Sequence, residues 1–106
     1  MDKSEYLLSI LMELPPNLEK IEKELLNNNY TAEEVSVAAC NFVDNCFCEC
    51  TWFEQSHGRV PKPEEVHSTY IYEICNLLLK FGLDPNLVID DVNIMYFLIY
   101  VDNGYV

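Results

Sequence analysis

The segment YTAEEVSVAACNFVDNC, residues 30–46, decides the fold class because it contains the clearest helix start in the chain. Thr31 and Glu34 have the spacing of a capping box, in which each side chain accepts the free backbone amide proton of the other residue. Tyr30 and Val35 flank the cap with the spacing of a hydrophobic staple. The apolar residues behind this start recur with helical spacing: Val35, Ala38, Ala39, Phe42, Val43 and Cys46. The segment therefore predicts a helix that buries one face.

Towards the N-terminus, prolines and asparagines divide the chain into two more predicted helices. Asp2 or Ser4 caps the first, and the pair Pro15-Pro16 ends it, because proline lacks the amide proton that a helix needs. Pro16 suits the first turn of the second helix, which the three asparagines at residues 27–29 stop. The buried residues expected in these helices are Leu7, Ile10, Leu11, Leu14, Leu18, Ile21 and Leu25.

Towards the C-terminus, we expect the helix that starts at Thr31 to run to about Gln55. Pro63, followed by two glutamates, predicts the first turn of a fourth helix, which Gly82 closes. After Gly82, a finger-like turn is expected over residues 83–90. The buried residues expected in the fourth helix are Val66, Tyr70, Ile74, Leu77, Leu78 and Phe81.

The last predicted helix is capped by Asp90 or Asp91 and extends to Tyr100 or Val101. Its sequence, NIMYFLIYV (residues 93–101), is apolar nearly all round. A helix of this kind needs neighbours on most sides.

Composition favours one helical domain with a strongly acidic surface. The chain has only 3 Gly and 5 Pro, which suits long helices and short loops, so we predict a single all-α domain over residues 1–106 with helices in antiparallel pairs. Its 18 acidic and 6 basic residues give a net charge of −12. Such a surface repels phosphate backbones and anionic lipids, so we expect no direct binding to nucleic acid or membranes and a basic protein as partner.

The five cysteines could carry chemistry, and we expect that they do not. Their odd number and the acidic N-terminal leader predict reduced thiols in a cytoplasmic protein. On a helix Cys46 and Cys50 share a face while Cys48 points away, and no C-x-x-C pair exists. We therefore predict that Cys46 and Cys50 are small core residues, with no bound metal and no other cofactor. The alternative is a small enzyme or zinc-binding protein that uses the Cys46–Cys50 cluster, with His57 nearby.

Residues 77–106, LLLKFGLDPNLVIDDVNIMYFLIYVDNGYV, resemble the boundary between two ankyrin repeats. The leucine-rich helix end, the turn from Gly82 through Asn86 and the closing pair Asn103-Gly104 match that family; the Thr-Pro-Leu-His opening of its first helix is absent. The resemblance implies an ankyrin-like stack of helix pairs with a β-hairpin finger. A repeat that stops before its second helix suggests truncation at the C-terminal end.

The resemblance implies a protein–protein interaction module rather than an enzyme. Small acidic chains of this kind look like bacterial immunity proteins, which inhibit toxins. The positions that match the family's binding surface, together with the unpaired C-terminal end, give these candidate contact residues: Asp90, Asp91, Asn93, Asp102 and Tyr105. We also expect self-association or capping by a partner through the C-terminal end. The structural alternative is the N-terminal fragment of a longer ankyrin-repeat protein.

Trp52 is the only tryptophan in the chain. Tryptophan is a favoured interface anchor. At its position in the predicted third helix, however, we expect it in the core, with an interface role as the alternative.

Overall fold

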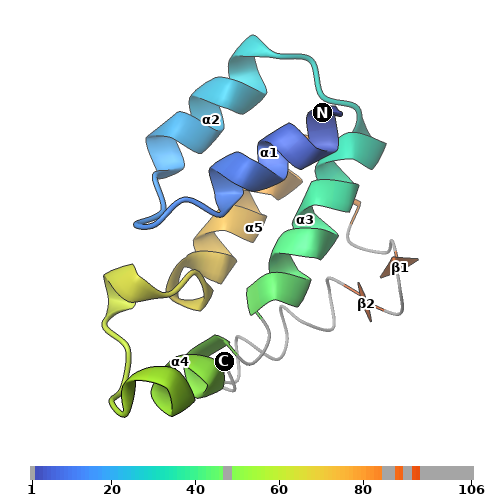
Figure 1. The fold of residues 1–106 in the computed structure, drawn as a ribbon. Helices are drawn as coiled ribbons and strands as arrows, with labels where there is room; N and C mark the ends of the chain where they lie inside the picture. Colours follow the sequence, from blue (N-terminus) through green and yellow to red (C-terminus); the bar gives the residue numbers. More distant parts are fainter. Residues whose placement is uncertain (1, 47–48, 85–87, 90–91, 94–106) are drawn as a thin grey trace.

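The computed structural model describes residues 2–46, 49–84, 88–89 and 92–93, and it is helical apart from one pair of two-residue strands (Figure 1). The predicted all-α class is confirmed. Five α-helices are described: α1 (Lys3–Leu11), α2 (Leu18–Asn27), α3 (Ala32–Cys46), α4 (Glu49–His57) and α5 (Ile71–Leu79). Two 3₁₀ turns, η1 (Pro63–Glu65) and η2 (Ser68–Tyr70), precede α5.

Local capping signals decide where three of the helices begin. Asp2 accepts the amide proton of Glu5 at 3.1 Å and so caps α1. Thr31 and Glu34 form the predicted capping box: the Thr31 hydroxyl accepts from Glu34 N at 3.1 Å, and the Glu34 carboxylate accepts from Thr31 N at 2.9 Å. The second helix differs from the prediction, because Asn17 rather than Pro16 occupies its start and caps Lys20 N.

The core lies between α1, α3 and α5, with α2 packed against α1. Its fully buried side chains include Leu7, Leu11, Ile21, Val35, Phe42, Val43, Ile74 and Leu78, all of which the helical spacing predicts. Leu14 is an exception: α1 ends at Leu11, so Leu14 lies in the following loop and is 47 % exposed. Gly82 closes α5 as predicted, with a φ of 107° that favours glycine.

Helical structure follows the predicted third helix and runs slightly past its expected end at Gln55. It is described as α3 up to Cys46 and as α4 from Glu49 to His57; residues 47 and 48 lie outside the described residues, and the two helices differ in direction in Figure 1. The Glu49 side chain at the start of α4 bonds to residues 67 and 68.

The predicted fourth helix is interrupted. Instead of running on from Pro63, the chain forms η1, an extended residue at Val66, and then η2 and α5. A continuous helix would donate the amide protons of His67 and Ser68 to carbonyls four residues earlier. Here both protons go to the Glu49 carboxylate, so the helix starts later.

The finger region contains an antiparallel pair of strands, β1 (Val88–Ile89) and β2 (Val92–Asn93), in which Val88 lies opposite Asn93. The extended finger is therefore present. The predicted fifth helix does not begin directly after Asp90 or Asp91, because the next two residues form β2. Residues 94–101 of that prediction lie outside the described residues.

No helix in the described ranges combines the length and the hydropathy that a bilayer crossing requires.

Candidate functional site

Helix α4 differs from the other helices because none of its nine residues, all of which the structure describes, is buried. Trp52 is 64 % exposed, so the prediction that it belongs to the core is wrong. The physical reason is helical geometry: the partly buried Cys50 and Phe53 continue the stripe of Cys46 at helical spacing, and Trp52 points away from that stripe. Exposed tryptophan is among the side chains that most often anchor protein interfaces.

The N-terminal end of α4 is fastened to the core by Glu49. One carboxylate oxygen accepts the backbone amide protons of His67 at 2.9 Å and Ser68 at 3.0 Å. The other lies 2.5 Å from Nδ1 of the His67 ring. The side chains are mostly buried, at 18 % exposure for Glu49 and 10 % for His67. Hydrogen bonds to a charged carboxylate in such a place are among the stronger polar contacts in proteins.

His67 extends this connection to two further helices. Its Nε2 lies 2.7 Å from the carbonyl oxygen of Met12, directly after α1. Its ring packs edge-to-face against Phe42 of α3, with 6.4 Å between the ring centroids. One side chain thus joins α1, α3 and α4.

Both ring nitrogens of His67 have hydrogen-bond partners. A carbonyl oxygen can only accept, so Nε2 donates to Met12. Nδ1 faces the Glu49 carboxylate at 2.5 Å. Neither nitrogen is therefore open to take a proton from a nucleophile. The pair is therefore built to hold elements together rather than to act as a general base.

The thiols near this pair are mostly buried. Cys46 is buried as predicted, and burial, with a smaller contribution from Glu49, raises the pKa of its thiol far above the usual range. Burial raises the pKa of Cys75 to about 12. Cys50 is half-buried, with its Sγ 3.4 Å from Oγ of Ser68, so it contacts the core less than expected. Neutral thiols are poor nucleophiles and poor metal ligands.

In the part of the chain that the structure describes, no three His, Cys, Asp or Glu side chains are placed so that they could hold a metal ion. Cys48 lies outside the described residues. The absence of a metal therefore stays a prediction.

Beyond its C-terminal end, α4 is followed by an ordered loop. The rings of Phe53 and His57 stack at 4.0 Å, and the Arg59 guanidinium lies 5.1 Å from the centre of the Phe53 ring. Arg59 also donates two hydrogen bonds to Glu65, at 2.8 and 2.7 Å. These bonds, followed by one from the backbone amide of Lys62, lower the pKa of the Glu65 carboxyl to about 2. A bidentate arginine–carboxylate pair has a fixed geometry, so it holds the loop in place.

We define the α4 surface by five residues on the helix and this loop: Trp52, Phe53, His57, Arg59 and Val60. Val60 is 72 % exposed, and Phe53 is partly covered by its two neighbours. The α4 surface thus presents a tryptophan and a valine on a helix whose start Glu49 fastens to the core, together with the loop that follows it. This is the candidate functional site.

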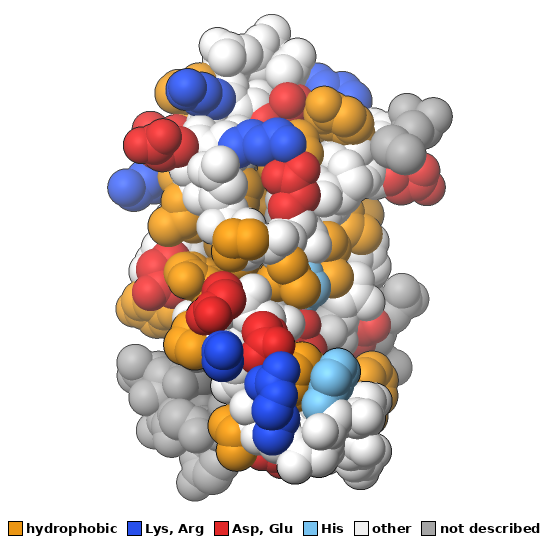
Figure 2. All heavy atoms as spheres, turned by 60° about the vertical axis from the view of Figure 1, so that its left-hand side comes forward, with side chains coloured by type: hydrophobic (Ala, Val, Ile, Leu, Met, Phe, Trp, Pro, Cys, Tyr) orange, Lys and Arg blue, Asp and Glu red, His pale blue; other side chains and the backbone are white. Residues whose placement is uncertain are grey.

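Two hollows near α2 are weaker candidates. An open depression of about 750 Å³ follows the loop between α1 and α2 and is lined by Leu14, Pro15, Pro16, Leu18 and Tyr70 among others. Figure 2, which brings the α2 side forward, shows apolar side chains across the middle of this face and charged ones towards both ends. Lys20 and Glu13 also line the depression, and they form an ion pair with 2.6 Å between Nζ and Oε2.

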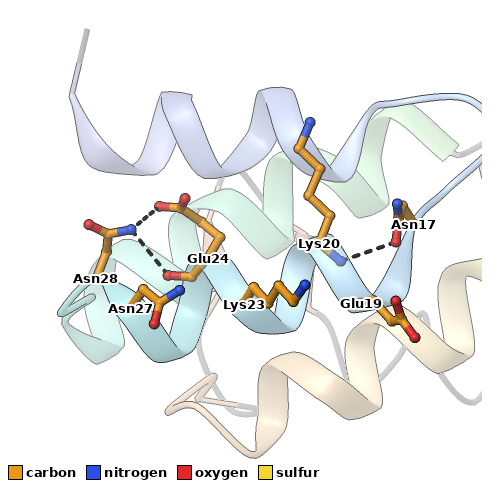
Figure 3. A pocket seen from close by; sticks show the side chains of 7 residues that line it. All are labelled: Asn17, Glu19, Lys20, Lys23, Glu24, Asn27 and Asn28. Carbon is orange, nitrogen blue, oxygen red and sulfur yellow. Dashed lines mark hydrogen bonds between the residues drawn. The ribbon is translucent and has the colours of Figure 1, made fainter.

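The second hollow, of about 300 Å³, lies along the polar side of α2 (Figure 3). Asn28 donates to the carbonyl and the carboxylate of Glu24, and the Asn17 side chain accepts from Lys20 N. The Glu24 carboxylate also accepts from the Tyr30 hydroxyl at 2.7 Å. These groups mostly satisfy one another, so they form the cap and end of α2 rather than a ligand site.

The contact residues predicted from the sequence cannot be placed in this description. Asp90, Asp91, Asp102 and Tyr105 lie outside the described residues, and Asn93 is described only as part of β2. Sequence reasoning did not single out Glu49 or His67. They are 18 residues apart, and no local pattern links them.

No protein-family model matches this chain, and no curated protein and no solved structure matches it either.

Proposed function

We propose that this protein is a non-enzymatic binding module whose α4 surface contacts a basic protein. The observation that carries the proposal is the exposure of Trp52 on a helix whose start Glu49 fastens to the core. A large aromatic side chain on a fixed element loses little conformational entropy on binding, which is why tryptophan is common among the residues that dominate interfaces.

The net charge of −12 supports the choice of a basic partner. An acidic protein attracts a basic one over several ångströms and raises the rate of encounter at low salt. Contact at the α4 surface would then contribute the short-range apolar part of the affinity. The ion pair between Arg59 and Glu65 leaves the local charge at Arg59 balanced.

The proposal includes an ankyrin-like pairing of the helices, cytoplasmic localisation and a role as an inhibitor or immunity-type protein. The turn at Gly82 and the β1–β2 pair support the ankyrin-like part, since both occur where the resemblance expects them. The described cysteines are in the reduced form, which supports a reducing compartment. The finger and C-terminal residues proposed from the sequence would form a second contact and a route to self-association.

The experiment is a comparison of three forms of the full chain: the wild type, Trp52→Ala and Tyr72→Ala. Tyr72 is a matched control, because it is also an exposed aromatic residue but lies on α5. Partners are captured from the native host, identified by cross-linking, purified, and titrated against each form at several salt concentrations.

We expect Trp52→Ala to weaken binding by at least about tenfold and Tyr72→Ala to leave it nearly unchanged, because truncation of an interface anchor costs about 2 kcal/mol or more. Affinity should fall as salt rises, since salt screens the attraction between opposite charges. A partner that binds Trp52→Ala as tightly as the wild type would refute the α4 surface. A partner whose binding does not respond to salt would refute the electrostatic part.

A further inference from the structure

We propose that the open depression beside the loop between α1 and α2 binds an extended segment of a basic protein, in which an apolar side chain lies next to a lysine or arginine. We call this hollow the loop depression and define it by residues 13–20 and Tyr70. It shares no residue with the α4 surface, so it is a second binding surface. Only the idea that both surfaces contact the same partner rests on the proposed function.

The loop depression lies between two parts of the chain that are tied together. The loop after α1 supplies one wall, and η2 supplies Tyr70. Nε2 of His67, directly before η2, donates to the Met12 carbonyl at 2.7 Å and so joins the two parts. Asn17 fixes the far end of the loop, because it caps α2. A ligand would therefore meet walls that are already in place, which lowers the entropy cost of binding.

The middle of the loop depression is apolar. Leu18 and Tyr70 are partly buried against the core, and Leu14 is 47 % exposed. Binding sites for small molecules enclose most of the ligand's surface, and this hollow is open to one side. It is better suited to an apolar side chain that a partner presents, since contact with these residues removes apolar surface from water.

One carboxylate at this hollow is available for a cation. Lys20 is paired with Glu13, so these two charges balance each other. Glu19 is exposed and has no hydrogen-bond or ion-pair partner among the described residues. In Figure 3 its side chain leaves α2 on a different side from that of Lys20. Because the whole chain carries a net charge of −12, a lysine or arginine is the charge that this place attracts.

Tyr70 adds a polar group to the apolar wall. Its side chain makes no hydrogen bond within the part of the chain that the structure describes, so its hydroxyl can donate to or accept from a ligand. An extended segment keeps backbone N–H and C=O groups available for such a contact, whereas a helix uses them internally. The apolar wall, the unpaired carboxylate and this hydroxyl together fit an extended segment that carries an apolar side chain beside a cation.

The test uses short capped peptides as probes and the full chain as the receptor. Three peptides are compared, in which lysine alternates with leucine, lysine with alanine, or glutamate with leucine. Proton–nitrogen NMR spectra follow the backbone amides of the protein as each peptide is added up to millimolar concentration. We expect saturable shifts around the loop depression with the lysine–leucine peptide only, because it alone combines a large apolar side chain with a cation.

Matched variants locate the contact. Leu14→Ala should weaken binding of the lysine–leucine peptide by at least about threefold, because it removes apolar contact area. Leu26→Ala should not, since Leu26 is an exposed leucine on α2 that does not line the depression. Glu19→Gln should weaken binding about twofold to fivefold, as expected for loss of an exposed ion pair. Glu22→Gln, an exposed acid on the same helix, should change it little.

Several results would overturn the inference. No saturable shift with the lysine–leucine peptide would remove the site. Equal binding of the lysine–alanine peptide would leave only general charge attraction, and equal binding of the glutamate–leucine peptide would remove the role of charge. Shifts at the loop depression that follow protein concentration without peptide would show that a second copy covers it. Equal effects of Leu14→Ala and Leu26→Ala, or of Glu19→Gln and Glu22→Gln, would place the peptide elsewhere.

Trp52→Ala separates this inference from the proposed function. It should bind the lysine–leucine peptide as the wild type does, because Trp52 does not line the loop depression. Weaker peptide binding by this variant would place the peptide on the α4 surface and overturn the inference. Equal binding of the captured partner by Trp52→Ala and the wild type would instead refute the α4 surface and leave the loop depression standing.

Discussion

Helices α3 and α4 lie next to each other in the sequence, yet they are held in the structure by different forces. Eight residues of α3 are buried, and they form one continuous stripe. No residue of α4 is buried, and its described hydrogen bonds to other elements start from Glu49 and Cys50 near its first turn. The comparison teaches that a helix can be fixed in place without being part of the core, and that such a helix can present an exposed side chain such as Trp52.

The largest expected effect concerns the buried side of this comparison. Phe42 is among the largest fully buried side chains, so Phe42→Ala should destabilise the protein by about 3–5 kcal/mol. Chemical denaturation measures the change. Trp52→Ala is the control, because an exposed side chain should cost no more than about 0.5 kcal/mol. Equal losses for the two variants would mean that α4 is packed as tightly as α3.

The next effect concerns the start of α4. Glu49→Ala removes the acceptor of His67 N, Ser68 N and the His67 ring, and should cost about 1–3 kcal/mol. Amide hydrogen exchange should rise in α4 more than in α3. Glu54→Ala, an exposed acid on the same helix, is the control and should change stability little. Unchanged exchange in α4 after Glu49→Ala would show that another contact holds it.

A smaller effect is expected at the start of α3. Thr31→Ala removes the hydroxyl that accepts from Glu34 N, so we expect a loss of about 1 kcal/mol. Denaturation at neutral pH measures it, with Ser56→Ala on α4 as the matched control for loss of an exposed hydroxyl. A loss above about 3 kcal/mol would be too large for a cap and would require a packing role for Thr31.

The smallest effect concerns the loop after α4 and depends on pH. The hydrogen bonds from Arg59, followed by the one from the Lys62 backbone amide, lower the pKa of Glu65 from 4.5 to about 2, so the ionised carboxyl stabilises the folded loop. This contribution is present above the unfolded pKa and is lost as the pH falls towards 2. Carbon NMR of the Glu65 carboxyl should show that pKa, and Arg59→Gln should return it towards about 4.3. The same titration in both forms would show that the pair does not exist in solution.

Several features were predictable because their causes lie within a few residues. The Thr31–Glu34 capping box, the cap at Asp2, the end of α5 at Gly82 and the buried stripe around Phe42 are all encoded by neighbouring positions. Backbone hydrogen bonding and helical spacing operate over three or four residues, so a sequence shows them directly. The all-α class follows from the same signals.

Trp52 is exposed because it lies off the stripe that Cys46, Cys50 and Phe53 form at helical spacing, so its place could have been read from the sequence. The tertiary structure alone decided how α4 is tied to the core. Glu49 accepts protons from residues 18 and 19 positions away, which no local rule shows. The His67 contact with Met12, across 55 positions, arises in the same way. Contacts of this kind require a long loop to close, which costs conformational entropy. They stabilise the protein only because the two groups meet once the core has formed.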